Sequence, residues 1–255
     1  SFSSPYVGHI AFIMRKYHIV FDDTEHASLE HMMYKPFASE IITPTFFSKD
    51  LGKKHIKFNS VFELCYLHPK YFKCDYSILD DLNLRKNERF IILRFISWDA
   101  IHDKGQKGMS YNEKIKAVKK LSNYAKVFIS SEKNLPDNLL KYKLNISPEK
   151  MHSLISCASL FFGESGTMAV EAALLGTPSV RVSTLASSLG NFKELKNKYK
   201  LIHYYSSGKK GLEKSIELIK DDKSKSKWNK RKDVFIKDKL DSNKYMFNRI
   251  INKLN

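Results

Sequence analysis

The stretch FFGESGTMAVEAALLGTP, residues 161–178, decides the fold of this chain. It predicts a short apolar strand, a turn of small residues and a helix that ends at a Gly-x-Pro sequence. A strand that turns directly into a helix points free N–H groups and the positive helix end outward, which suits a phosphate or diphosphate. Ser165 and Thr167 add hydroxyl donors, and Gly166 allows a ligand to approach the backbone closely.

Glu171 lies four residues after Thr167, one helical turn further along the same face. We expect its carboxylate to reach sugar hydroxyls once phosphates occupy the helix end, by analogy with the acidic ribose contact of dinucleotide-binding folds. The alternative interpretation is an exposed helix residue without a ligand.

Strands and helices alternate from residue 90 onward. The expected strands are 90–96, 126–130, 160–162, 178–182 and 201–205, and the expected helices are 111–124, 147–158, 167–175, 212–219 and 242–254. Repeated β-α-β units with short connections predict a parallel sheet covered by helices on both faces. The fold class is therefore α/β, with a complete doubly wound Rossmann-like domain at residues 89–240.

The first 90 residues hold fewer elements, with one convincing strand at 18–22 and a second candidate strand at 40–44. Two or three strands rarely form a stable domain alone. We therefore expect residues 1–73 to be the C-terminal part of an N-terminal Rossmann-like domain and residues 74–88 to be a linker. The helix in residues 241–255 is expected to pack back on the first domain.

Two loops at predicted strand ends carry candidate chemistry. The loop after residues 18–22 holds a carboxylate and an imidazole close together, a pairing that suits a general base and its orienting partner. His26 is the first choice for the base, with Glu25 or Asp23 as alternatives. The competing interpretation is a helix cap, with Thr24 or Asp23 as the N-cap.

The second loop, residues 97–108, follows the first strand of the larger domain. Ser97 and His102 are expected to touch phosphates or an acceptor, and Trp98 to stack on a base or sugar. Trp98 fits equally well as a buried aromatic residue between domains.

Net charge, apolar runs and cysteine spacing limit the classes of function that the chain can have. The 255 residues carry 44 Lys+Arg against 27 Asp+Glu, a net charge of +17, and residues 191–255 account for +11 of it. A solvated lysine-rich helix face is the first interpretation, attraction to an anionic membrane surface the second, and nucleic acid the least favoured. No apolar run reaches the length of a membrane-spanning helix. Three cysteines without CxxC spacing and the lack of a leader-like start predict a cytoplasmic protein with reduced thiols, peripheral at the inner membrane face in the second interpretation.

The pattern Ser-Gly-x-x-x-x-Glu-Ala followed by Gly-x-Pro resembles the nucleotide-sugar site of the GT-B superfamily. That superfamily includes the UDP-N-acetylglucosamine 2-epimerases and the MurG-type glycosyltransferases. Three further stretches, FDDTEHA (21–27), TPTFFSKDLG (43–52) and RFISWDAIHD (94–103), resemble a prokaryotic GT-B-like family catalogued as a domain of unknown function. The resemblance implies that Ser165, Gly166 and Thr167 hold a diphosphate and Glu171 holds the ribose.

The resemblance further implies an enzyme that uses a nucleotide sugar, with a UDP-sugar as substrate and no cofactor. The His-Arg-Arg-Glu-Asn motif of the epimerases is absent, because SWDAIHDKG (97–105) stands in its place. This favours a hexosyltransferase-like glycosyltransferase of cell-surface polysaccharide biosynthesis, with a lipid-linked or polysaccharide acceptor. No Asp-x-Asp sequence occurs in the chain, so metal-independent transfer is expected. The alternatives are a 2-epimerase-like enzyme and a non-catalytic binder of nucleotide sugars or nucleic acid.

Overall fold

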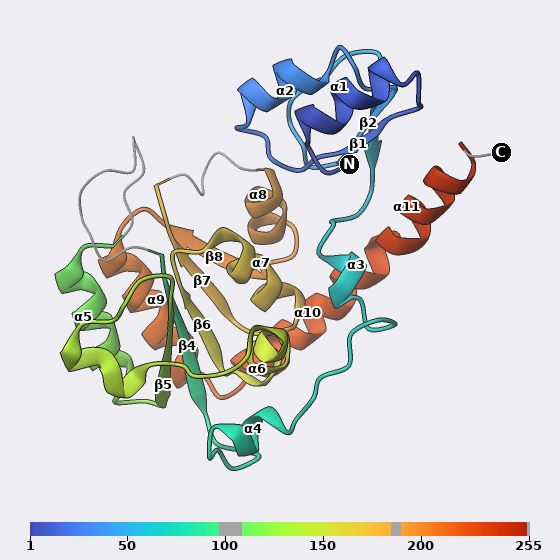
Figure 1. The fold of residues 1–255 in the computed structure, drawn as a ribbon. Helices are drawn as coiled ribbons and strands as arrows, with labels where there is room; N and C mark the ends of the chain where they lie inside the picture. Colours follow the sequence, from blue (N-terminus) through green and yellow to red (C-terminus); the bar gives the residue numbers. More distant parts are fainter. Residues whose placement is uncertain (97–108, 185–189, 254–255) are drawn as a thin grey trace. The chain divides into compact units, whose positions relative to one another are not determined.

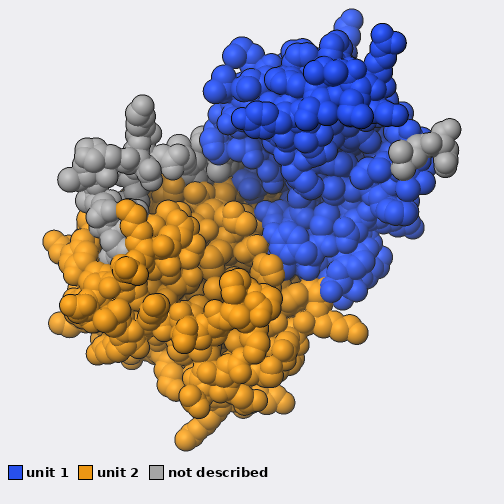
Figure 2. All heavy atoms as spheres, viewed as in Figure 1, with its two compact units in different colours: residues 1–71, 189–191, 236–255 blue, residues 72–188, 192–235 orange. Residues whose placement is uncertain are grey.

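The computed structural model describes residues 1–96, 109–184 and 190–253. The chain divides into two compact units, which Figure 2 shows in different colours. Unit 1 comprises residues 1–71, 189–191 and 236–255, and unit 2 comprises residues 72–188 and 192–235. Each unit contains its own parallel sheet (Figure 1).

Unit 2 is built on a five-stranded sheet in the order β5-β4-β6-β7-β8, in which every neighbouring pair is parallel. Its strands are β4 (Phe90–Phe95), β5 (Lys126–Ser131), β6 (Leu160–Gly163), β7 (Ser179–Val182) and β8 (Ile202–Tyr205). The chain adds β5 on one side of β4 and all later strands on the other side. Open α/β sheets bind ligands at such a reversal of strand order, outside the carboxyl ends of the strands.

Helices lie on both faces of this sheet. The helices of this part of the chain are α4 (Ile78–Asp81), α5 (Tyr111–Leu121), α6 (Met151–Cys157), α7 (Gly166–Leu174), α8 (Gly190–Asn197), α9 (Gly208–Lys220) and α10 (Ser224–Asp238), with 3₁₀ helices η1 (Asp137–Tyr142) and η2 (Pro148–Lys150). Gly211 of α9 lies against Val180 and Val182, while Ser179 donates a hydrogen bond to Ala169 O of α7. Because successive strand residues point to opposite faces, α9 and α7 pack on opposite sides of β7.

The carboxyl ends of β4, β6 and β7 are aligned at Gly163. Gly163 of β6 pairs with Arg94 of β4 on one side and with Arg181 of β7 on the other. A Cβ atom at Gly163 would collide with the backbone oxygen of Arg94. Glycine is therefore the residue that allows β4 and β6 to pair at this point, directly before the turn into α7.

Unit 1 holds a three-stranded parallel sheet in the order β1-β2-β3. Its elements are α1 (Pro5–Ile13), β1 (Ile19–Phe21), α2 (Ser28–Tyr34), β2 (Glu40–Pro44), β3 (His55–Phe58), α3 (Leu64–Leu67) and α11 (Ser242–Ile251). The last helix packs on this sheet, because the rings of Tyr245 and Phe58 stack with their centroids 5.0 Å apart. Arg249 of α11 also donates to the Glu40 carboxylate at 2.7 and 2.8 Å.

Two local expectations were wrong, and one helix was missed. The cap interpretation of the loop at residues 22–26 fails, since α2 begins only at Ser28 and no side chain caps it. The helix expected over 147–158 is divided into η2 and α6, and the Ser147 side chain does not cap η2. Helix α1 was not predicted, although Ser4 caps it and Pro5 opens it, a pair that the sequence displays.

None of the helices in the described part of the chain is long and apolar enough to cross a membrane.

Candidate functional site

The turn between β6 and α7 forms in the way the sequence predicts. Ser165 has extended backbone angles and caps α7, with its Oγ accepting from Met168 N at 3.3 Å. The first N–H groups of a helix have no acceptor within the helix. Ser165 and Gly166 are partly exposed and Thr167 is exposed. The positive end of α7 is thus accessible from solvent, as an anion site requires.

The Glu164 side chain ties this turn to neighbouring segments of unit 2. Its buried carboxylate accepts from Met109 N at 2.7 Å and Ile96 N at 3.0 Å, and it lies 3.1 Å from Lys114 Nζ. Lys114 is equally buried and belongs to α5. Glu164 was not among the predicted site residues, although a charged residue between Gly163 and the cap of α7 is a signal for such a structural role.

Glu171 is buried on α7, so the alternative of an exposed helix residue is wrong. Its Oε1 lies 3.1 Å from Nε2 of His152, a residue of α6. The ring of His152 in turn meets Phe72 edge-on, with centroids 6.4 Å apart. The Glu171 carboxylate is therefore fixed in orientation by a neighbouring helix, an arrangement that prepares it to accept hydrogen bonds from a ligand. His152 was not predicted.

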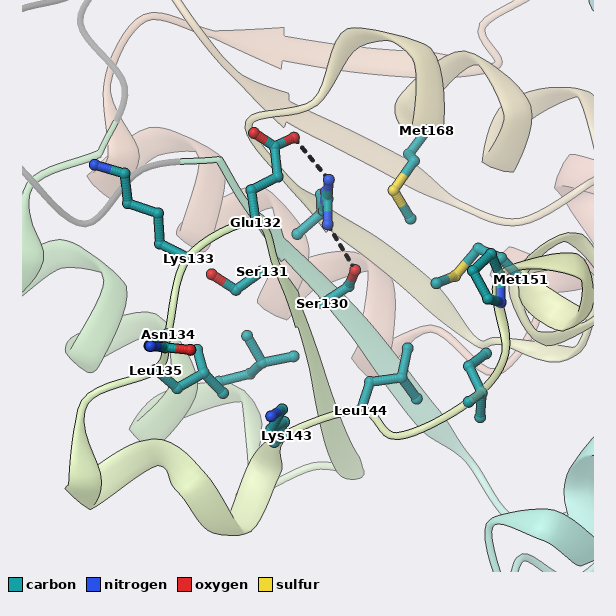
Figure 3. A pocket seen from close by; sticks show the side chains of 14 residues that line it. Ser130, Ser131, Glu132, Lys133, Asn134, Leu135, Lys143, Leu144, Met151 and Met168 are labelled. Atoms are coloured by element: carbon teal, nitrogen blue, oxygen red, sulfur yellow. Dashed lines mark hydrogen bonds and ion pairs between the residues drawn. The ribbon is translucent and has the colours of Figure 1, made fainter.

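A cavity of about 530 Å³ opens at the carboxyl ends of β4 and β5. Figure 3 shows its lining, which includes Arg94, Ser130, Glu132, Lys143, Met151 and Met168. Its volume falls within the range usual for small-molecule sites. Met168 belongs to α7 and is three residues from Glu171, so the two side chains are neighbours on the helix surface. The cavity, the turn and Glu171 thus share one end of the sheet.

Arg94 shapes the wall of this cavity. It donates to Ser130 Oγ at 2.8 Å and to Glu132 Oε1 at 2.7 Å, the two contacts drawn as dashed lines in Figure 3. These contacts hold polar groups in fixed positions on a lining that is about half polar and half apolar. Polar groups in fixed positions orient a ligand in a pocket.

Arg181 of β7 lies next to the turn between β6 and α7. Its Nε donates to the backbone oxygen of Glu164 at 3.2 Å, and its guanidinium lies 4.5 Å from the ring centroid of Phe192. The side chain is buried, and burial lowers the pKa of Arg181 to about 10. A Cβ atom at Gly166 would be only 3.2 Å from Cζ of Arg181, so the guanidinium lies directly against the first residue of α7.

The candidate catalytic residues lie in unit 1. His26 is exposed, whereas Glu25 is buried and its Oε1 accepts from Ser48 N at 2.5 Å. Burial, followed by repulsion from Asp22, raises the pKa of Asp23. In the described residues, no hydrogen bond joins His26 to either carboxylate.

A buried polar cluster that the sequence did not reveal stands beside this loop. Asp22 accepts from Tyr34 Oη at 2.6 Å and from Thr24 N at 2.8 Å, and it lies 3.1 Å from His31 Nε2. Burial and the bond to Asp22 raise the pKa of Tyr34. The cluster ties α2 to the end of β1 and thereby fixes the start of the loop that carries His26. The spacing of His31 and Tyr34 on one helix face is the signal that could have found it.

The predicted site residues therefore fall into three groups. Ser165, Gly166, Thr167 and Glu171 come together on unit 2, and Asp23, Glu25 and His26 share one loop of unit 1. Ser97, Trp98 and His102 lie outside the described residues. No cluster of three or more His, Cys, Asp or Glu side chains suited to a metal ion occurs in the part of the chain that the structure describes.

Comparison with known families gives a match over almost the whole chain. A family described as "Protein of unknown function (DUF354)" matches residues 4–255. A comparison with curated proteins gives no match.

Solved structures show the same fold. An Anabaena protein, Alr3699/HepE, in complex with UDP and glucose has a TM-score of 0.61 at 15% identity, covering 96% of this chain and 74% of that one. The S. aureus MnaA–UDP structure has a TM-score of 0.57 at 13% identity, covering 87% and 64%. A UDP-N-acetylglucosamine 2-epimerase has a TM-score of 0.56 at 12% identity, covering 88% and 62%. The chain thus spans less than two thirds of the length of the last two. At these identities the likeness shows the fold, which is the GT-B class of parallel α/β proteins.

Proposed function

The chain belongs to the DUF354 family, and on that premise we propose that it binds a nucleotide sugar and acts as a GT-B-type glycosyltransferase. The observation that carries the proposal is the cavity of about 530 Å³ at the carboxyl ends of β4 and β5, whose lining includes Met168 in the first turn of α7. A nucleotide sugar needs an apolar recess for its base, an acceptor for its ribose hydroxyls and donors for its diphosphate.

Unit 2 offers a group for each part of that ligand. The nucleobase occupies the cavity, whose lining includes Met151, Met168 and the guanidinium of Arg94. The buried Glu171 carboxylate accepts from the ribose hydroxyls, and the amides of Gly166 and Thr167 with the nearby hydroxyls hold the diphosphate. The Anabaena and S. aureus structures contain UDP, which supports UDP as the nucleotide.

Transfer also needs a base for the acceptor hydroxyl and charge stabilisation of the departing diphosphate. His26 is the proposed base, because it is exposed while Glu25 is buried and bonded to Ser48 N. Asp23 is the alternative, since a raised pKa makes a carboxyl group a better proton acceptor near neutral pH. The helix end stabilises the diphosphate, so the reaction is proposed to proceed without a metal ion.

The acceptor is proposed to be lipid-linked or a polysaccharide, in cell-surface polysaccharide biosynthesis at the cytoplasmic face of the membrane. The net charge of +17 supports an encounter with anionic lipid carriers or an anionic membrane face.

Epimerisation is the second candidate, favoured by the similarity in fold to a UDP-N-acetylglucosamine 2-epimerase. It requires removal and return of a proton at sugar C2, so deuterium would enter C2 in deuterated water without an acceptor. Glycosyl transfer instead releases UDP only when an acceptor is present.

The experiment is calorimetric titration with UDP, CDP and GDP, followed by a UDP-release assay with UDP-sugars and lipid-linked acceptors in the presence of EDTA. We expect UDP to bind most tightly and UDP release to depend on the acceptor. His26→Asn should abolish release while leaving UDP binding intact, whereas His9→Asn, a change at another histidine of unit 1, should leave both unchanged. Equal release by the His26 variant would contradict the assignment of the base.

A further inference from the structure

Arg181 is a buried cation with no counter-ion among the described residues. The residue is 8% exposed, and none of the carboxylates that the structure describes forms an ion pair with it. Nε donates to the backbone oxygen of Glu164, but the buried Nη1 has no hydrogen-bond partner in the described part of the chain. An unpaired charge and an unsatisfied donor are both costly away from water, so such a group requires a reason to be retained.

The position of the guanidinium makes this cost larger. It lies against Gly166, since a Cβ atom there would be 3.3 Å from both Nη1 and Nη2. Gly166 is the first residue of α7, whose N-terminus carries the positive end of the helix dipole. The guanidinium and the positive end of the helix dipole therefore lie next to each other, and neither neutralises the charge of the other. An anion at this point would lower the energy of both.

We propose that Arg181 is a specificity-determining residue that, with the N-terminus of α7, selects a diphosphate over a monophosphate or an uncharged nucleoside. The inference rests on the proposed binding of a nucleotide sugar and adds the group that reads its charge. Glu164 is not available to neutralise Arg181, because its carboxylate is occupied by Lys114 and two amides. The guanidinium charge is thus left for the ligand.

The glycine of the turn leaves room for this guanidinium. A Cβ atom at residue 166 would lie 3.2 Å from Cζ of Arg181, so the guanidinium would have to shift by a few tenths of an ångström. The other side of the guanidinium packs on the ring of Phe192. Packing between Gly166 and Phe192 thus holds the cation beside the first residue of α7.

The test compares Arg181→Met and Arg181→Lys with Arg231→Met. Arg231 is a matched control, because it also lies 4.5 Å from a ring centroid, that of Trp228, and donates to a backbone oxygen, that of Lys200. Affinities for UDP, UMP, uridine and inorganic pyrophosphate are measured by calorimetry at one salt concentration, and thermal midpoints are measured without ligand.

We expect Arg181→Met to bind UDP and pyrophosphate about 10- to 100-fold more weakly, as for loss of a charge-assisted hydrogen bond. Its uridine affinity should be unchanged, its preference for UDP over UMP should be lost, and its thermal midpoint should be equal or higher. Arg181→Lys should lose only part of the preference, and Arg231→Met none.

An unchanged ratio of UDP to UMP affinity in Arg181→Met would overturn the inference while leaving the proposed function intact. If the wild type binds pyrophosphate but not UDP, the proposed nucleotide is wrong, and loss of pyrophosphate binding in Arg181→Met still supports the anion site. If the wild type binds neither, both proposals fail. If Arg181→Met does not fold, the UDP-to-UMP affinity ratio of Arg181→Lys is the deciding measurement. A ratio equal to that of the wild type would contradict a role for the guanidinium.

Discussion

Glu164 and Glu171 are seven residues apart in one motif, yet their surroundings differ. Glu164 makes contacts with Lys114 and two backbone amides, which gives it a structural part in the turn. The Glu171 carboxylate meets the half-exposed His152 beside a cavity. Glu164 supports the turn, and Glu171 is the proposed contact of the ribose.

Replacing Glu171 by Gln should weaken UDP binding about 10- to 100-fold, because a charged acceptor of the ribose hydroxyls becomes a neutral amide. Calorimetry measures the change. Glu217→Gln on α9 is the control, since that exposed carboxylate pairs with Lys214 three residues away. Retention of full UDP affinity by the Glu171 variant would show that the ribose assignment is wrong.

Replacing Lys114 by Met should lower the free energy of unfolding by about 3–5 kcal/mol, because it leaves the Glu164 charge buried without its partner. Lys126→Met removes the exposed partner of Glu88 and should cost at most about 1 kcal/mol. Urea unfolding of both variants gives the comparison. Equal losses would mean that the Lys114–Glu164 pair is no stronger than a surface pair.

Helix α7 is the element on which the site depends. It begins at Gly166 behind a serine cap and lies on the β7 face opposite α9. Its N-terminus supplies the donors, its second turn supplies Glu171, and Met168 between them borders the cavity. One helix thus carries groups proposed to contact three parts of a nucleotide.

Ser165→Ala should lower the free energy of unfolding by about 1 kcal/mol and also weaken UDP binding, because the first turn of α7 frays. Ser207→Ala removes the equivalent cap of α9 and should cost a similar amount without changing UDP affinity. Chemical unfolding and calorimetry on both variants separate the two effects. A loss of affinity in both variants, or in neither, would contradict a special role for the α7 terminus.

The positions of the unit 2 strands along the chain and the turn before α7 were predictable, because each depends on local sequence: apolar runs and small turn residues. The placement of the β-α-β units in unit 2 follows from the same pattern, and the family match and solved structures confirm the fold class. Arg181, His152 and Lys114 could not be found in this way. Their roles come from contacts between segments 17 to 50 residues apart, which only packing brings together.

At the scale of the whole molecule, the basic C-terminal segment contributes to packing as well as charge. In α10, Trp228 Nε1 donates to Leu201 O at 2.6 Å, and Lys225 Nζ donates to Ser156 O at 2.7 Å and Ala158 O at 2.9 Å. Burial lowers the pKa of Lys225 to about 7. The interpretation of the basic C-terminal segment as a solvated lysine-rich helix face is therefore incomplete.

The stability of the whole chain should depend on His203 of β8. Burial, followed by repulsion from Lys214, lowers the pKa of His203 from 6.5 to about 4. Between these values the unfolded chain holds the proton and the folded chain does not, so stability falls as the pH drops through this window and is constant above it. The loss amounts to at most about 3 kcal/mol.

Thermal or urea unfolding at pH 7.5 and pH 4.5 measures this dependence. His203→Gln removes the titrating group and should flatten the curve between the two pH values, whereas His68→Gln in unit 1 should leave its slope unchanged. An identical slope in wild type and the His203 variant would place the acid sensitivity elsewhere.

The central claim is that a nucleoside diphosphate binds at the N-terminus of α7. The most direct measurement is amide NMR of the full chain during titration with UDP, with glycine and threonine labelled by nitrogen-15. We predict that the amide signals of Gly166 and Thr167 shift to saturation with UDP and far less with uridine. Unmoved Gly166 and Thr167 signals at saturating UDP would contradict the account.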